Sequence, residues 1–230
     1  MTEQDKIDKA IKMVKQFAPN YKVLLKKDSK VQRVIGWILS KIGNPDYMTS
    51  YVTTLGSTSY LPSGYDSGTD SGLWKTILHE GQHAKDAQNV SSVVFGIAYL
   101  LPQLIGILGI VYSLVVGVAL LFGAPLALLW GCTSLLFLAP LPAYGRAMAE
   151  VRGYTVSLAV NFWSGQLEDE TLYVNWLVDV FSGPGYYYMW PFKSWVRAYF
   201  NQKLLELKNG TFVLDSYLAA CKVLSKDLSS

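Results

Sequence analysis

An uncharged run constrains the fold of this 230-residue chain more than any other feature. From Ala87 to Gly145, 59 residues in succession include no Asp, Glu, Lys or Arg. Apolar stretches of this length are typical of membrane-spanning segments. A break at Gly123-Ala124-Pro125 divides the run into two parts, each close to the roughly 20 residues that a helix needs to cross a bilayer. The sequence therefore predicts a transmembrane helical hairpin, with spans at 100–122 and 125–143.

The charges beside this run predict the orientation of the hairpin. Lys85 precedes the run, Arg146 and Arg152 follow it, and the turn between the two spans carries no charge. Positive residues favour the cytoplasmic side, so we expect an integral membrane protein whose remaining parts lie in the cytoplasm. The chain begins without an apolar signal segment, which leaves the internal run to direct insertion. A helical pair buried in a soluble protein, or against a partner, is the alternative.

Both histidines of the chain lie in one five-residue motif, His79-Glu80-Gly81-Gln82-His83. Residues four apart share a face of an α-helix, so both imidazoles can reach one metal ion. The H-E-x-x-H pattern is typical of zinc hydrolases, in which the glutamate acts on a metal-bound water. We expect His79 and His83 to bind Zn²⁺, Glu80 to be the general base, and Asp70 or Ser71 to cap the helix. A surface helix that carries the motif by chance is the alternative.

A third protein ligand is needed, because catalytic zinc takes three and keeps one position for water. No other histidine exists and neither cysteine has a partner nearby, so the ligand should be a carboxylate. We predict Glu150, which follows the uncharged run and has small neighbours such as Gly153 that let a second helix approach. A surface glutamate paired with Arg146 or Arg152 is the alternative. Asp86 is better placed to accept a hydrogen bond from a ligating imidazole.

The remaining segments predict a mainly α fold with a short β element. The first 41 residues hold ten Lys/Arg against four Asp/Glu, spaced as on amphipathic helices near a membrane surface. Residues 51–61 are rich in β-branched and aromatic residues and predict one bent strand or two short strands around Gly56. The last third is aromatic and helical, which suits either the lipid headgroup level or an ordinary core.

We predict one membrane-embedded domain over residues 1–230, because no repeat or low-complexity linker divides it. Its expected parts follow in chain order. They are basic amphipathic helices (1–45), the strand and H-E-x-x-H helix (46–90), the transmembrane hairpin (91–144), and the Glu150 helix with the aromatic-rich helical end (145–230).

A resemblance follows from the motif and the later glutamate. His-Glu-x-x-His with Glu150 on a later helix resembles the gluzincin metallopeptidases. The hydrophobic hairpin between them resembles HtpX-like and CAAX-prenyl-protease-type membrane metallopeptidases. The resemblance implies a zincin-like core, and it places residues 51–61 as the edge strand that holds an extended substrate. Where those families continue the glutamate with x-x-Ala-Asp, this chain reads Glu150-Val151-Arg152-Gly153-Tyr154.

The expected function is that of a zinc-dependent membrane metallopeptidase. Glu80 would take a proton from metal-bound water, and the substrate would be a peptide or protein segment near the bilayer. Tyr154, Arg152 or one of Tyr186 to Tyr188 would stabilise the oxyanion. The alternative is a membrane structural or interaction protein with a zincin-derived core and little or no activity. A nucleic-acid partner is not expected.

Overall fold

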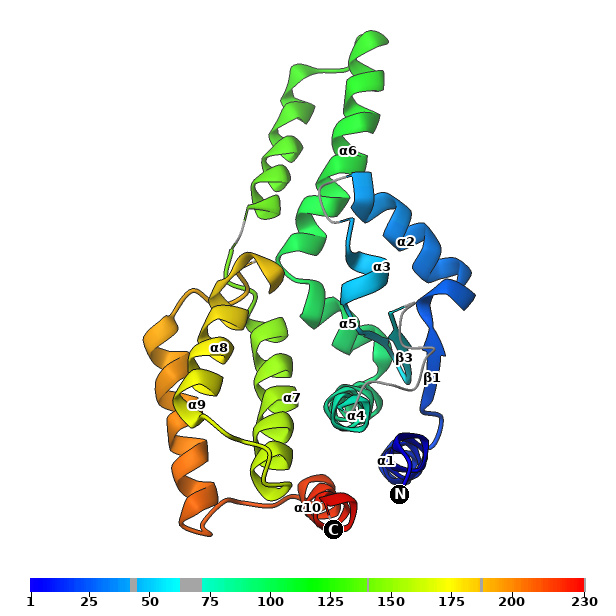
Figure 1. The fold of residues 1–230 in the computed structure, drawn as a ribbon. Helices are drawn as coiled ribbons and strands as arrows, with labels where there is room; N and C mark the ends of the chain where they lie inside the picture. Colours follow the sequence, from blue (N-terminus) through cyan, green and yellow to red (C-terminus); the bar gives the residue numbers. More distant parts are fainter. Residues whose placement is uncertain (42–44, 63–71, 140, 187, 230) are drawn as a thin grey trace. The chain divides into compact units, whose positions relative to one another are not determined.

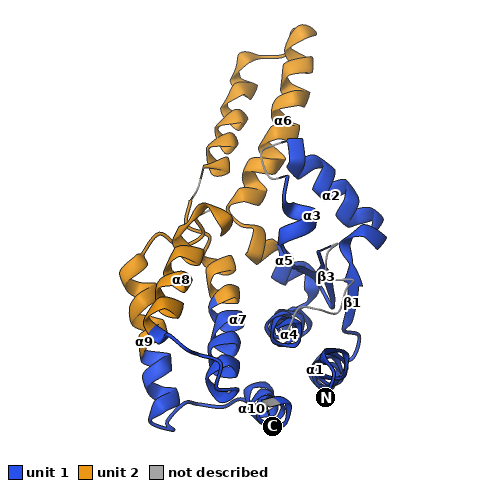
Figure 2. Ribbon diagram, in the orientation of Figure 1, with its two compact units in different colours: residues 1–96, 151–170, 202–230 blue, residues 97–150, 171–201 orange. Residues whose placement is uncertain are grey.

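The computed structural model describes residues 1–41, 45–62, 72–139, 141–186 and 188–229. The chain forms two compact units, and it passes between them repeatedly (Figure 2). Unit 1 holds residues 1–96, 151–170 and 202–230, and unit 2 holds residues 97–150 and 171–201. The assignment of all 230 residues to one domain stays a prediction. The expected helix cap at Asp70 or Ser71 lies outside the described residues.

Helices dominate both units, as the sequence predicted (Figure 1). The helices wholly within unit 1 are α1 (Glu3–Phe17), α2 (Lys30–Lys41), α3 (Tyr47–Ser50), α4 (Leu73–Val90) and α10 (Ser216–Ser229), with the 3₁₀ turn η1 (Lys26–Asp28). Those within unit 2 are α6 (Gln103–Leu121), α8 (Glu170–Ser182, except its first residue), η3 (Leu126–Leu138) and η4 (Pro184–Tyr186), the last two being 3₁₀ helices. The helices α5 (Ser92–Leu100), α7 (Tyr144–Trp163) and α9 (Lys193–Lys208) contribute to both units.

A three-stranded sheet supplies the short β element. Its order is β1-β3-β2, with β1 (Lys22–Leu25) parallel to β3 (Thr58–Leu61) and β2 (Thr53–Leu55) antiparallel to it. Of the two predicted alternatives, one bent strand or two short strands, the structure has the two short strands, and Gly56 has a positive φ of 60° in the turn between them. Strand β1 was not predicted, because Val23 is its single β-branched residue.

Helix α4 occupies the centre of unit 1. Its apolar side chains, among them Trp74 and Leu78, belong to a core that also contains residues of α1, α7 and α10. At Gly81 a Cβ atom would lie 2.5 Å from Val14 of α1 and 2.3 Å from the hydroxyl of Tyr217 in α10. That hydroxyl donates a 2.6 Å hydrogen bond to the carbonyl of Leu78. The glycine inside the H-E-x-x-H motif thus lets two helices approach α4 closely.

Unit 2 contains a helical hairpin formed by α6 and η3. The two arms run antiparallel: a Cβ on Gly106 would meet Leu138, and one on Gly109 would meet Ser134. Closer to the turn, the Tyr112 hydroxyl donates to the carbonyl of Leu128. The hairpin was predicted, but its second arm is a 3₁₀ helix ending at Leu138, shorter than the expected 125–143. Small residues at the contact allow this close pairing.

The hairpin arms have lengths that suit a bilayer. Helix α6 has 19 residues and spans about 28 Å at 1.5 Å per residue. The 13 residues of η3 span about 26 Å at the 3₁₀ rise of about 2 Å. Among the described residues, α6 is the one helix long and apolar enough to cross a membrane, with a mean hydropathy of 2.7, and η3 is apolar but shorter. Membrane insertion of the pair stays a prediction.

Candidate metal centre

Helix α4 presents the motif side chains in a buried setting. His79, Glu80 and His83 are 7%, 9% and 5% exposed. One helical turn separates the two imidazoles, and their Nε2 atoms lie 3.2 Å apart. The surface-helix alternative is therefore wrong, since a chance motif on a surface helix would face solvent.

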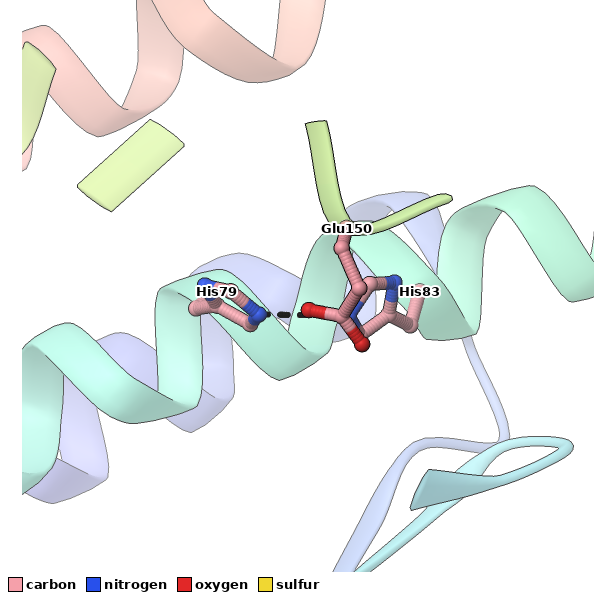
Figure 3. A group of neighbouring side chains, drawn as sticks. All are labelled: His79, His83 and Glu150. Atoms are coloured by element: carbon pink, nitrogen blue, oxygen red, sulfur yellow. Dashed lines mark hydrogen bonds between the residues drawn. The ribbon is translucent and has the colours of Figure 1, made fainter. Parts of the chain in front are cut away.

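Helix α7 approaches α4 through a glycine. A Cβ atom on Gly153 would lie 2.6 Å from Nε2 of His79 and 2.7 Å from its Cε1, so no other residue fits without displacing the ring. Glu150 lies one turn earlier on the same helix. One ligand atom each from His79, His83 and Glu150 falls within 4.8 Å of the others. Figure 3 shows the Glu150 carboxylate directed toward the two imidazoles. The three predicted metal residues are brought together.

The separation of the two Nε2 atoms fits a shared metal ion. Two nitrogens bound tetrahedrally to zinc at 2.0–2.1 Å would be about 3.3 Å apart. The observed 3.2 Å is close to that value. Two imidazoles and a carboxylate also form the donor set of the His₂Glu catalytic zinc sites. The residues present therefore fit a divalent cation such as Zn²⁺, with His79, His83 and Glu150 as its ligands.

A hydrogen bond to Ser157 sets the tautomer of His79. The Ser157 hydroxyl donates to the Gly153 carbonyl at 3.4 Å, which leaves its oxygen to accept from Nδ1 of His79 at 2.9 Å. With Nδ1 as the donor in this bond, Nε2 would present its lone pair to the metal position. This role was expected of Asp86, and that prediction is wrong. The Asp86 oxygens instead accept from Gln82 at 2.9 Å and from Arg152 at 2.8 Å.

Glu150 is held as a buried carboxylate. Its side chain is 3% exposed, and its Oε1 accepts a 2.7 Å hydrogen bond from the Tyr99 hydroxyl. The alternative of a surface glutamate paired with arginine is wrong, because a buried carboxylate is not a surface residue. The arginines bind elsewhere, Arg152 to Asp86 and Arg146 to the Tyr99 carbonyl. In metal sites, a carboxylate that binds the metal is commonly also held by a hydrogen bond from a neighbouring residue.

A chain of hydroxyl groups ends on Glu80. Thr54, on the edge strand β2, donates a 2.6 Å hydrogen bond to Oε2 of Glu80. The Thr54 oxygen then accepts from Ser59 at 2.6 Å, and the Ser59 oxygen accepts from Tyr21 at 2.9 Å. Burial raises the pKa of the Tyr21 hydroxyl far above its usual range, so this group remains a donor. The three hydroxyls fix the carboxylate of Glu80 in one orientation.

A buried lysine lies in the electrostatic field of Glu80. Lys26 is fully buried, and burial lowers the pKa of its ammonium group to about 8, while the Glu80 carboxylate acts in the opposite direction. Its Nζ donates a 2.6 Å hydrogen bond to the Tyr47 carbonyl and lies 3.5 Å from the centre of the Tyr47 ring. Gln32 accepts a 2.6 Å bond from the Tyr47 hydroxyl. This cluster joins α2, α3 and η1.

The candidates for oxyanion stabilisation differ in their surroundings. The Tyr154 ring packs edge-on against His79, with centroids 4.7 Å apart. Arg152 pairs with Asp86, and Tyr186 and Tyr188 belong to unit 2. Tyr187 lies outside the described residues. Tyr154 is thus the candidate that contacts a predicted ligand within unit 1. It occupies the position at which the resembled families have aspartate.

Comparisons with protein-family models, curated proteins and solved structures return no match. The site therefore stands on its own geometry. Sequence reasoning missed Thr54, Ser157 and Tyr99, each of which orients a predicted functional side chain. Of these three, only Ser157 could have been predicted from the sequence, because it follows Gly153 by four residues and so lies on the same helix face.

Proposed function

We propose that the chain is a zinc-dependent membrane metallopeptidase that cleaves peptide bonds close to a bilayer. The observation that carries this proposal is the buried meeting of His79, His83 and Glu150, with Glu80 next to the first imidazole on α4. Catalytic zinc sites of this donor set keep a fourth position for water. Bound zinc would lower the pKa of that water to about 7 and polarise a carbonyl group.

The residues around that position have separate tasks. Glu80 accepts the proton of the attacking water and delivers it to the departing amine. Thr54 holds the Glu80 carboxylate in the orientation that proton transfer requires, through its 2.6 Å bond. Ser157 keeps Nε2 of His79 unprotonated. The Tyr154 hydroxyl is our choice for a donor to the developing oxyanion, since its ring lies against His79.

An extended peptide is the substrate form that the sheet favours. Strand β2 forms one edge of the sheet, and its Thr54 contacts Glu80 directly. A peptide added to this edge would pair its backbone with β2 and pass beside the general base. The resemblance to gluzincins implies the same use of an edge strand. The substrate class is therefore an unfolded segment of a protein.

The bilayer is the second part of the proposal. The hairpin α6–η3 lies in sequence between His83 and Glu150, so two crossings would return the chain to the side from which it left. The arms are apolar and mostly exposed, as lipid contact requires. The positive residues beside the run favour a metal centre on the cytoplasmic side.

A matched pair of variants tests the activity. The full chain is purified in detergent, its zinc content is measured, and cleavage of a mixture of unfolded membrane-protein fragments is followed with and without a chelator. Glu80→Gln should retain zinc and lose cleavage by about 1000-fold or more, because the proton acceptor is removed. Glu206→Gln, on α9 outside the metal centre, should cleave at the wild-type rate.

Two results would contradict the peptidase assignment. If Glu80→Gln bound zinc and cleaved as fast as the wild type, Glu80 would not be the general base. If the wild type bound stoichiometric zinc but no chelator-sensitive cleavage were found on any fragment, the structural alternative with a zincin-derived core would replace the enzyme.

A further inference from the structure

Helix α2 carries its apolar side chains on the outside of the protein. Val31, Val34, Trp37 and Ile38 are 58%, 57%, 65% and 47% exposed. Their spacing of three, three and one residues places them on one side of a single helix. A surface helix of a soluble domain normally has the opposite arrangement, with its apolar side toward the core.

The orientation of α2 is fixed by the groups on its inner side. Gln32 is fully buried and accepts the 2.6 Å bond from the Tyr47 hydroxyl. A Cβ atom on Gly36 would lie 2.6 Å from the Met48 side chain, so the helix is in close contact with α3 at that point. A rotation that buried the apolar side would break this hydrogen bond and force bulky side chains against Met48. The outward position of the apolar side is therefore built into the packing.

Basic residues mark both ends of the exposed apolar side. Lys30 begins α2 and Lys41 ends it, and both are exposed and share the helix side of Val34. Arg33 adds a third positive charge, and the helix has no acidic residue. Long basic side chains can place their stems along apolar surface and their charges among headgroups. The charge pattern is thus complementary to an anionic lipid surface.

We propose that the outer side of α2 inserts into the headgroup region of an anionic bilayer. Val34 and Trp37 enter the boundary between headgroups and acyl chains, while Lys30 and Lys41 bind lipid phosphates. Tryptophan favours this depth because its ring is amphipathic. The contact is separate from the α6–η3 hairpin, and it would hold unit 1 against the membrane surface. It rests on the membrane part of the proposed function and is independent of peptidase activity.

Depth-dependent fluorescence quenching tests this contact in the full chain. Every variant carries Cys132→Ser, and Cys221 is fully buried and so protected from labelling. A thiol-reactive fluorophore is placed by Val34→Cys on α2, by Lys12→Cys on the exposed side of α1, and by Val115→Cys on α6. The proteins are reconstituted into vesicles of phosphatidylcholine and phosphatidylglycerol containing brominated acyl chains. The label at residue 34 should lose at least half of its fluorescence, whereas the label at residue 12 should retain it.

The label at residue 115 separates the two membrane contacts. If it is quenched and the label at residue 34 is not, the hairpin is inserted but the α2 proposal is wrong. If neither is quenched, membrane insertion fails as a whole. If the label at residue 34 is quenched equally in vesicles of phosphatidylcholine alone, the role given to Lys30 and Lys41 is wrong.

A second copy of the chain is the competing occupant of this side of α2. The unlabelled chain is compared with Val34→Glu by mass measurement in detergent. A dimer that Val34→Glu converts to a monomer, together with an unquenched label at residue 34, would overturn the bilayer assignment. A single mass for both proteins, together with quenching at residue 34, would support it.

Discussion

Helices α4 and α6 have nearly the same length and opposite relations to their surroundings. Helix α4 has 18 residues and buries eleven of them, including the polar His79, Glu80, Gln82 and His83. Helix α6 has 19 residues, is strongly apolar, and buries four. In water, burial of polar groups is costly and exposure of a large apolar surface is unfavourable. In α4, hydrogen bonds offset the cost of burying polar groups. In α6, a lipid environment would remove the cost of exposing apolar surface to water.

The comparison shows that burial of a helix follows from its bonding partners and its solvent, rather than from hydropathy alone. In α4, His79 bonds Ser157 and Glu80 bonds Thr54, so desolvation of these groups is compensated. In α6, two of the four buried residues are glycines, Gly106 and Gly109, and they lie close to the other arm. Substitutions in α6 and at the contacts of α4 test this difference.

A lysine on the outer side of α6 should have the largest effect. Val115 is 62% exposed, so Val115→Lys would be tolerated if α6 faced water. In a bilayer the same change near the helix centre costs about 2.5–3.5 kcal/mol of insertion free energy. We expect the ratio of inserted to uninserted chains to fall about 100-fold in a cell-free insertion assay. Val213→Lys, at a residue 80% exposed in unit 1, should insert as the wild type does. Equal insertion of both variants would show that α6 is not a membrane span.

The close approach of α7 to α4 gives the next largest effect. Gly153→Ala would place a methyl group 2.6 Å from Nε2 of His79, so the ring or the helix must move. Overpacking of this kind costs about 1–3 kcal/mol, and here it also displaces a candidate metal ligand. We expect a lower melting temperature and weaker zinc binding, measured by unfolding scans and competition with a chelator. Gly117→Ala has open space and should be neutral or slightly stabilising. Unchanged zinc affinity in Gly153→Ala would argue against Nε2 as a ligand atom.

The hydroxyl of Thr54 should affect turnover more than binding. Thr54→Val keeps the side-chain shape and removes the donor to Glu80, which is 2.6 Å away. We expect kcat to fall about tenfold with little change in KM or zinc content, because a misoriented base transfers protons less often. Thr54→Ser keeps the hydroxyl and should restore most of the rate. If Thr54→Ser lowered kcat as much as Thr54→Val does, the effect would come from the packing of the methyl group and not from the hydroxyl.

Much of the candidate metal centre could be predicted from the sequence, because each signal was local or chemical. The motif placed His79 and His83 on one helix face, and the need for a third ligand led to Glu150. The contacts that orient these groups come from other parts of the chain. Thr54 is 26 residues from Glu80, and Tyr99 is 51 residues from Glu150. No spacing rule connects such pairs, because tertiary packing brings them together.

The α2 helix shows a second limit of sequence reasoning. Its periodicity correctly predicted an amphipathic helix, but periodicity does not state which side faces inward. The inner side was decided by one buried glutamine and one glycine that contacts Met48. Strand β1 was missed for a related reason, since its four residues gain their β conformation by pairing with β3.

The smallest effect concerns Lys26, the buried cation that contacts Tyr47. Its pKa is about 8 in the folded protein, against an ordinary value of 10.5. Between these values the unfolded chain binds more protons than the folded chain, so the free energy of unfolding rises with pH across this window. Lys26→Met removes this dependence. The stability of the wild type relative to Lys26→Met should therefore increase by about 1 kcal/mol between pH 8 and pH 9, measured by denaturant unfolding in detergent. A difference that stays constant over that range would mean that Lys26 titrates as an ordinary exposed lysine. Burial would then impose no free-energy cost on its charged form.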